Sequence, residues 1–186
     1  MPRNASDKRD RLTAAAIELA YAQGFDRSTI ADIAAAAGVP SGSVYYHFRS
    51  KDDVASAIAG ALADAVVAES AGWDAAGGPR ERLAAYIDAQ VGAEGGRGSR
   101  VGAIALELRR QAGEAAEAGA AHRALVAWAA AQYEELGFSA EAAEARAMHL
   151  ITGMEGAALM AAVLEDSTPI EREAAHLKRW VAATKV

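Results

Sequence analysis

Alanine is the feature that most limits what this sequence can fold into: 51 of its 186 residues are alanine, about 27% of the chain. Alanine has the highest helix propensity of all residues and is depleted in strands. Only four prolines occur, and no stretch alternates β-branched or aromatic residues with polar ones as a strand would. We therefore predict an all-α fold.

Glycines and capping residues mark the predicted ends and starts of helices, and together they predict about nine helices. A Thr29–Asp32 pair resembles a capping box, and a Thr-Pro-Ile-Glu run at 168–171 is typical of a helix start. The helices are expected at about 7–23, 29–37, 41–48, 51–71, 80–94, 101–111, 114–136, 139–166 and 168–184, with a glycine-rich loop at 92–102. We expect a helix-turn-helix domain at 1–51 and a helical ligand-binding and dimerisation domain at 52–186.

The chain contains no cysteine, which excludes disulfides, thiol nucleophiles and cysteine-based metal centres. Its first ten residues lack the apolar core of a signal peptide. The longest apolar run, 156–164, is nine residues, whereas crossing a membrane takes about 20. These features predict a cytoplasmic protein with no membrane partner.

Charge is distributed unevenly along the chain. The net charge is −6, but residues 1–51 carry a net +2 and the remainder carries −8. A slightly basic first segment attached to an acidic body could contact an anionic partner at one end only.

The segment 29–51 carries the most specific pattern. Two short helices joined by a tight turn containing Gly38 form a helix-turn-helix, whose second helix enters the DNA major groove. That helix begins with the small residues Ser41 and Gly42, which let a backbone approach DNA closely and leave N–H groups free for phosphate. A lysine, Lys51, follows at a position suited to a phosphate contact.

The alternative for this segment is that its apolar residues are only core. We accept that interpretation for Val44 and Phe48. A purely structural interpretation would not explain why two aromatic residues and a cation, Tyr46, His47 and Lys51, are exposed to solvent. We therefore favour DNA contacts for these three.

This segment resembles the DNA-binding domain of the TetR family. The matching residues are Gly24-Phe25, Ser28-Thr29, Ile33-Ala34, Ala37-Gly38-Val39, Gly42-Ser43-Val44-Tyr45, His47-Phe48 and Lys51. The resemblance covers about residues 8–60 and implies a homodimeric repressor that binds a palindromic double-stranded operator and is released by a small-molecule effector. By position, the DNA-contacting residues would be Thr29, Ser41, Gly42, Tyr45, Tyr46, His47 and Lys51.

Two positions depart from the family pattern. Pro40 stands where many members have a serine that caps the recognition helix, the second helix of the helix-turn-helix. Ser41 stands where members often have a lysine. The loss of that lysine should weaken binding to the DNA backbone. The C-terminal half is similar, more loosely, to the LmrA/YxaF-type subgroup, through residues 102–108 and 154–157.

The predicted helix 139–166 is apolar nearly all round between 147 and 164, which indicates burial on several sides. Gly153, Ala157 and Ala161 recur at helical spacing and form a smooth strip that permits close helix approach. We expect this helix and the last one to form a two-fold four-helix dimer interface. The expected contacts are Gly153, Ala157, Ala161, Leu177, Trp180 and Val181, and the alternative is an ordinary monomer core.

A drug-sized pocket needs apolar and aromatic walls with a few polar groups. Candidates for its lining are Tyr86, Gln90, Trp128, Met148, Thr152 and Met154, with Met160 nearby. No basic cluster occurs among them, so a neutral or apolar ligand is expected. Met and aromatic residues at helical spacing are more often simple core, so core is the favoured alternative for each residue taken singly. We interpret His149 as a hydrogen-bonded core residue or else a ligand contact, and Glu155 as an exposed or paired carboxylate or else a pocket acid or dimer contact.

Enzyme signatures are missing from the sequence. Gly96 and Gly98 lack the third glycine of a dinucleotide fingerprint, no P-loop occurs, and the four histidines form no metal-binding motif. We therefore expect no catalytic activity, no cofactor and no metal. The alternative function is a helical small-molecule-binding protein or enzyme without regulatory DNA binding.

Overall fold

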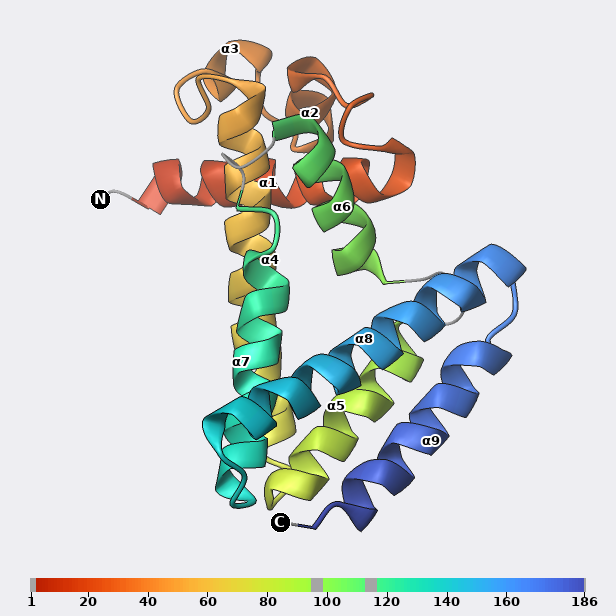
Figure 1. Ribbon diagram of the computed structural model, residues 1–186. Coiled ribbons are helices and arrows are strands. Elements are labelled where there is room, and N and C mark those ends of the chain that lie inside the picture. The colour runs from red at the N-terminus through yellow and green to blue at the C-terminus, as the bar shows by residue number, and fades with distance from the viewer. Residues whose placement is uncertain (1–2, 95–98, 113–116, 186) are drawn as a thin grey trace. The chain divides into compact units, whose positions relative to one another are not determined.

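A computed structural model describes residues 3–94, 99–112 and 117–185 (Figure 1). In these ranges the chain forms nine helices and no strand, which confirms the predicted all-α class. The helices are α1 (Arg3–Gln23), α2 (Ile30–Ala36), α3 (Ser41–Val44), α4 (Lys51–Asp74), α5 (Pro79–Glu94), α6 (Arg100–Ala112), α7 (Ala120–Glu135), α8 (Ala140–Leu164) and α9 (Thr168–Ala183).

Several helix bounds differ from those expected. Helix α1 begins four residues earlier than predicted, and α3 has one helical turn followed by a hydrogen-bonded turn at 45–47. Of the predicted loop 92–102, residues 95–98 lie outside the described residues, as do residues 113–116 around the expected start of α7. Helix ends depend on local caps, which explains why they are harder to predict than the helices themselves.

The chain divides into two compact units. The first comprises Met1–Asp64 together with Val101–Ala121, and the second comprises Ala65–Arg100 together with His122–Val186. This division differs from the expected boundary at residue 51 in two ways: α4 contributes to both units, and α6 belongs to the first. The inclusion of α6 reflects long-range contacts that no local sequence pattern reports.

The first unit is built around α1, α2 and the first half of α4. Leu12, Phe25, Ile33, Phe48 and Ile58 are buried with less than 2% of their surface exposed. Gly24 ends α1 with a φ of +95°, a left-handed conformation that glycine adopts without strain. In this unit α2 packs against α1, and α3 packs against α2.

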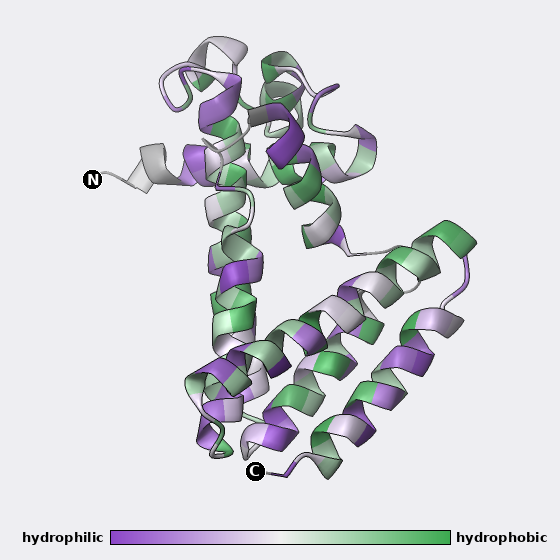
Figure 2. Ribbon diagram, in the orientation of Figure 1, coloured by the Kyte–Doolittle hydropathy of each residue, from purple (hydrophilic) through white to green (hydrophobic). Residues whose placement is uncertain are grey.

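The second unit is a bundle in which α9 packs against both α5 and α8. Its core contains Leu83, Ile87, Leu150, Leu177 and Val181, all buried. Figure 2 shows polar and apolar residues alternating along α9, whereas most residues in the C-terminal half of α8 are apolar. Burying one face of α8 therefore still leaves apolar side chains on another.

Two of the described helices, α4 and α8, are long and apolar enough to cross a membrane by length and composition alone. The uninterrupted nine-residue run considered from the sequence did not reveal them, because isolated polar residues such as Glu155 interrupt the apolar stretches. Core helices of water-soluble proteins pass the same test, so this is a weak indication. The absence of a membrane partner stays a prediction.

Candidate nucleic-acid interface

The turn between α2 and α3 has the geometry expected of a helix-turn-helix. Helix α2 begins with a complete capping box, in which Thr29 Oγ1 accepts a hydrogen bond from the Asp32 amide and the Asp32 carboxylate accepts one from the Thr29 amide at 2.9 Å. It ends at Ala36, and Gly38 two residues later has a φ of +63°, while the Val39 amide donates to the Ala34 carbonyl at 2.9 Å. The chain then turns sharply into α3.

The recognition segment, residues 41–47, separates its buried side chains from its exposed ones. Val44 is fully buried and Phe48, just beyond the segment, is 1% exposed, as predicted for core residues. Tyr45 and Tyr46 are 64% and 91% exposed. Ser41 and Gly42 are exposed and His47 is half-buried. The segment therefore presents two aromatic side chains and a small-residue helix start to solvent.

Gly42 is not required by the fold of the subunit. A Cβ atom added to it would meet nothing within 4 Å, and its backbone lies outside the left-handed region. A helical glycine with no internal role is destabilising by about 1 kcal/mol relative to alanine. No contact of Gly42 within the described residues explains its presence.

Thr29 is committed to capping α2. Its hydroxyl donates to Asp32 Oδ2 at 2.6 Å while accepting from the Asp32 amide. The side-chain and backbone hydrogen bonds from Thr29 hold the pKa of the Asp32 carboxyl below its usual value. The expected phosphate contact by Thr29 would thus have to compete with an ionised carboxylate at the same helix end.

Lys51 is also occupied within the subunit. Its Nζ donates to the Asp26 carbonyl at 2.7 Å, lies 3.9 Å from Asp26 Oδ1, and sits 5.0 Å from the centroid of the Phe25 ring. Its side chain is 38% exposed. Lys51 therefore ties the start of α4 to the turn between α1 and α2, a role that the sequence did not suggest.

Sequence reasoning missed two side chains that hold the helix-turn-helix in place. Arg11 Nη2 donates to the Ala37 carbonyl at 2.5 Å, where a cation complements the C-terminal end of α2. Glu107 of α6 accepts a hydrogen bond from the Asp26 amide at 3.1 Å. Because these partners lie 26 and 81 residues apart in the chain, only a three-dimensional structure could pair them.

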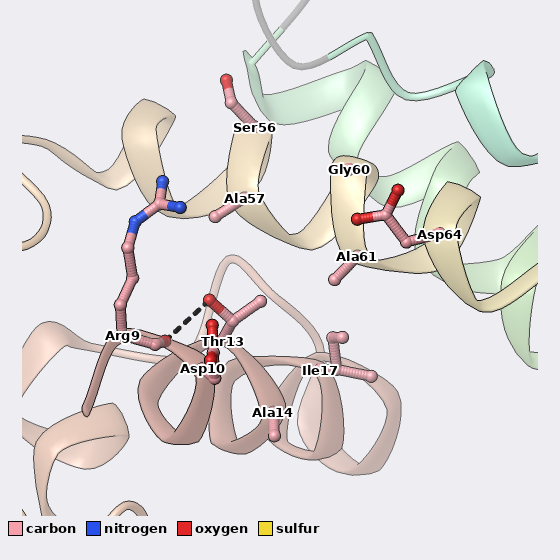
Figure 3. A pocket seen from close by; sticks show the side chains of 10 residues that line it. All are labelled: Arg9, Asp10, Thr13, Ala14, Ile17, Ser56, Ala57, Gly60, Ala61 and Asp64. Atoms are coloured by element: carbon pink, nitrogen blue, oxygen red, sulfur yellow. Dashed lines mark hydrogen bonds between the residues drawn. The ribbon is translucent and has the colours of Figure 1, made fainter. Parts of the chain in front are cut away.

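A groove of about 430 Å³ runs between α1 and α4 within the first unit (Figure 3). Alanines and Gly60 provide much of its lining, and the carboxylates of Asp10 and Asp64 are exposed at it. Arg9, at one end, places its guanidinium 5.3 Å from the centre of the Phe48 ring. This lining differs from the apolar and aromatic walls expected of a drug-sized site.

The second unit contains an aromatic cluster. Trp73, Tyr86 and Trp128 pack with ring centroids 4.9 to 5.9 Å apart, and the Trp128 indole donates to Asp74 at 3.0 Å. Burial, with a smaller contribution from the charge of Glu155, raises the pKa of the Tyr86 phenol far above its usual value. Two predicted ligand-binding residues, Tyr86 and Trp128, are thus in contact.

Glu155 is a paired carboxylate, one of the interpretations left open above. Its Oε1 accepts from Ser99 Oγ at 2.9 Å and lies 3.2 Å from His122 Nε2. The Glu155 and His122 side chains are each 28% exposed. An apolar helix thereby carries a partly shielded acid with two polar partners, within electrostatic reach of Tyr86.

The other predicted ligand residues do not share one environment. Met154 is buried and Gln90 half-buried, whereas Met148 and Thr152 are exposed on another face of α8. His149 is exposed as well, with its ring 4.9 Å from that of Trp180. Its interpretation as a hydrogen-bonded core residue was wrong, because α8 turns this face to solvent in the subunit.

The smooth strip expected at the dimer interface lies inside the subunit. A Cβ atom on Gly153 would be 2.9 Å from Glu173 Oε1 and 3.2 Å from Leu177 Cδ1, both on α9 of the same chain. Ala161, Leu177 and Val181 are buried, while Ala157 and Trp180 are half-buried. The close helix approach that these small residues permit is therefore the α8–α9 contact. Large exposed apolar side chains lie elsewhere on α8: Met148, Leu159, Met160, Val163 and Leu164.

Comparison with known proteins agrees with this geometry. The family described as "Bacterial regulatory proteins, tetR family" matches residues 12–58. The HTH-type transcriptional regulator YvdT of Bacillus subtilis is 39% identical over 59 residues, and SrpR of Pseudomonas putida is 43% identical over 54 residues. These alignments cover 32% and 29% of this chain, but only 30% and 25% of the two relatives.

The fold extends the likeness to the whole chain. A TetR transcriptional regulator from Legionella pneumophila superposes with a TM-score of 0.78 at 22% identity, covering 98% of this chain and all of that one. Residues 12–58 thus match the TetR family of regulators, and the chain as a whole has the fold of this solved regulator. The matching family and both of these relatives are described as regulatory proteins or transcriptional regulators. These comparisons do not test the resemblance to the LmrA/YxaF-type subgroup, which stays a hypothesis.

Proposed function

We propose that this chain is a DNA-binding transcriptional repressor of the TetR family, which recognises double-stranded operator DNA through residues 41–47. The observation that carries the proposal is the pairing of Tyr45 and Tyr46, largely exposed, with Gly42, which the subunit itself does not need. Phosphate contacts position such a segment, and side chains that reach base edges supply specificity. Tyr45, Tyr46 and His47 are the base-reading candidates.

The DNA backbone contacts differ from those first expected. Lys51 and Thr29 are engaged inside the subunit, so in this proposal they support the recognition segment more than they contact phosphate. Arg49 is exposed directly after Phe48. Its guanidinium and the N–H groups at Ser41 and Gly42 are our candidates for phosphate binding.

The proposal includes a homodimer on a palindromic operator. Two recognition segments in successive major grooves stand about 34 Å apart, which requires a two-fold pair of subunits. We assign the contact to the exposed apolar side chains of α8, because Leu159, Met160 and Val163 form an apolar surface that a monomer would leave in water.

Release by a small-molecule effector is the third part of the proposal. The aromatic cluster of Trp73, Tyr86 and Trp128 beside Glu155 is our candidate for the effector region. An effector is then expected to combine an apolar body with a group that interacts with the acid, a refinement of the neutral or apolar ligand expected from the sequence. A cytoplasmic location follows from access to DNA.

The test is selection of duplexes from a random DNA library by the full-length protein, followed by a gel shift at several salt concentrations. We expect a palindromic sequence to be enriched and its affinity to fall steeply with salt despite the net charge of −6. Failure to enrich any sequence, together with equal binding of all duplexes, would favour the alternative of a small-molecule-binding protein without regulatory DNA binding.

A further inference from the structure

Helix α6 is part of the unit that carries the helix-turn-helix. It lies more than 40 residues beyond the segment that matches the family, yet Val101–Ala121 groups with Met1–Asp64. Its Ile104 and Leu108 are 1% and 0% exposed. The DNA-binding unit is therefore not a continuous stretch of sequence, and its function depends on residues outside that stretch.

The polar contact between α6 and the helix-turn-helix is made by Glu107. Its Oε1 accepts a hydrogen bond from the Asp26 amide at 3.1 Å. The same oxygen lies 3.0 Å from the position that a Cβ atom would take on Gly24. Gly24 also has a φ of +95°, so glycine is needed there both for the backbone conformation and for the approach of Glu107.

The peptide groups of Asp26 are held from both sides. Glu107 binds the Asp26 N–H, and the Nζ of Lys51 binds the Asp26 carbonyl at 2.7 Å. Ser28 closes the same turn by donating from its hydroxyl to the Gly24 carbonyl at 2.9 Å. The turn leads directly into Thr29, the N-cap of α2, so its conformation decides where and in which direction α2 begins.

We propose that Glu107 is a positioning residue for DNA recognition: from α6 it fixes the α1–α2 turn and thereby the helix-turn-helix. The inference rests on the proposed function. A hydrogen bond from a backbone N–H to a carboxylate is among the stronger ones. Fixing the turn before DNA binds means that its ordering does not reduce the affinity.

The experiment compares Glu107→Ala with Glu107→Gln in the full-length protein. Both variants remove one negative charge, but the glutamine keeps a carbonyl oxygen at the same reach. The probe is the duplex selected by the wild type from a random library. We expect Glu107→Ala to bind it about tenfold more weakly than Glu107→Gln, which corresponds to about 1.4 kcal/mol. The salt dependence should be unchanged, because no phosphate contact is lost.

Two further measurements separate positioning from loss of folding. Amide exchange of Asp26, followed by NMR without DNA, should be faster in Glu107→Ala than in Glu107→Gln. Glu144→Ala, at an exposed carboxylate of α8 in the second unit, removes the same charge and should leave DNA affinity and Asp26 exchange unchanged. If Glu107→Ala does not fold, Glu107→Asp retains the charge, shortens the side chain by one carbon, and should show the same losses against the wild type.

The failure of this inference is distinguishable from that of the proposed function. Equal DNA affinity of the alanine and glutamine variants, on a duplex that the wild type binds, would overturn the role of Glu107 alone. A wild type that selects no duplex would overturn the proposed function. Unchanged Asp26 exchange in Glu107→Ala would overturn the positioning contact itself.

Discussion

Gly24 and Gly42 stand 18 residues apart and are glycines for opposite reasons. At Gly24 the backbone has a φ of +95° and Glu107 is 3.0 Å from where a Cβ would be. At Gly42 the backbone is helical and nothing lies within 4 Å of such an atom. One glycine serves the fold of the subunit, and the other leaves room for something outside it.

The two alanine substitutions at these glycines should have opposite effects. Gly42→Ala should not lower the melting temperature and should stabilise α3, by up to about 1 kcal/mol, because alanine favours helix. It should weaken binding of the selected duplex. Gly24→Ala should destabilise the protein by about 1 to 2 kcal/mol through left-handed backbone strain. Thermal unfolding and gel shifts measure both, and undiminished DNA binding by Gly42→Ala would contradict close approach of DNA at this residue.

Substitutions of Lys51 and Arg49 should differ in their effect on the salt dependence of DNA binding. Lys51→Met removes the hydrogen bond to Asp26 and should cost about 1 kcal/mol of stability while leaving the salt slope of DNA binding unchanged. Arg49→Gln should leave stability unaltered and reduce that slope by about 1. A reduced slope for Lys51→Met instead would mean that its ammonium leaves Asp26 for a phosphate when DNA binds.

At the scale of elements, α2 and α8 show which features local sequence can predict. The capping box of α2 follows from neighbouring residues, and the structure confirms it. Which face of α8 is buried could not be predicted, because the helix is apolar nearly all round and its periodicity favours no side. The contacts of Lys51 and Glu107 join distant segments, for which the sequence carries no local signal.

The Asp32 carboxyl at the start of α2 should make the stability of the protein depend on pH. The hydrogen bonds from Thr29 lower the pKa of the Asp32 carboxyl in the folded state, so its stabilising effect is present above the unfolded value of about 3.9 and is lost as pH falls through the folded pKa. Asp32→Asn should therefore be less stable than the wild type near neutrality, and the difference should shrink in acid. Chemical unfolding at several pH values measures this. A difference that stays constant down to the lowest pH would contradict it.

Helix α8 offers a matched pair of substitutions for the proposed dimer. Val163→Asp places a charge on a side chain that is 70% exposed in the subunit, so it should produce monomers without unfolding the second unit. Gly153→Val should lower the melting temperature, because it would collide with Glu173 and Leu177, and leave the dimer formed. Light scattering and thermal unfolding distinguish these outcomes. A dimeric Val163→Asp at micromolar concentration would place the interface elsewhere.

For the whole molecule, α6 connects the two proposed activities through the chain itself. Ser99, just before it, bonds to Glu155 in the second unit, and Glu107 within it bonds to Asp26 in the first. Glu155 is thus linked to the turn that precedes α2 by two hydrogen bonds and the stretch of chain from Ser99 to Glu107. An effector can shift DNA binding only by its differential affinity for the two states.

Thermodynamic linkage sets the size of the coupling between effector binding and DNA binding. A compound that weakens operator binding about 100-fold has a coupling free energy of about 2.7 kcal/mol, and saturating operator must weaken binding of that compound by the same factor. Titration calorimetry with and without the selected duplex measures the reciprocal effect. A compound whose affinity is unaffected by DNA would not be an allosteric effector, although DNA binding itself would stand.

The placement of the tryptophans gives the two units different optical signatures. Trp73, Trp128 and Trp180 all belong to the second unit, whereas the first carries only tyrosine and phenylalanine rings, Tyr45 and Tyr46 among them. Indole emission therefore reports the second unit alone. The centroids of Trp73 and Trp128 are 4.9 Å apart and their planes are inclined at 62°, so the two rings are held in a fixed asymmetric arrangement and should give near-ultraviolet circular dichroism bands. These bands should vanish when the second unit melts, and a helical signal that outlasts them would belong to the unit that carries the helix-turn-helix.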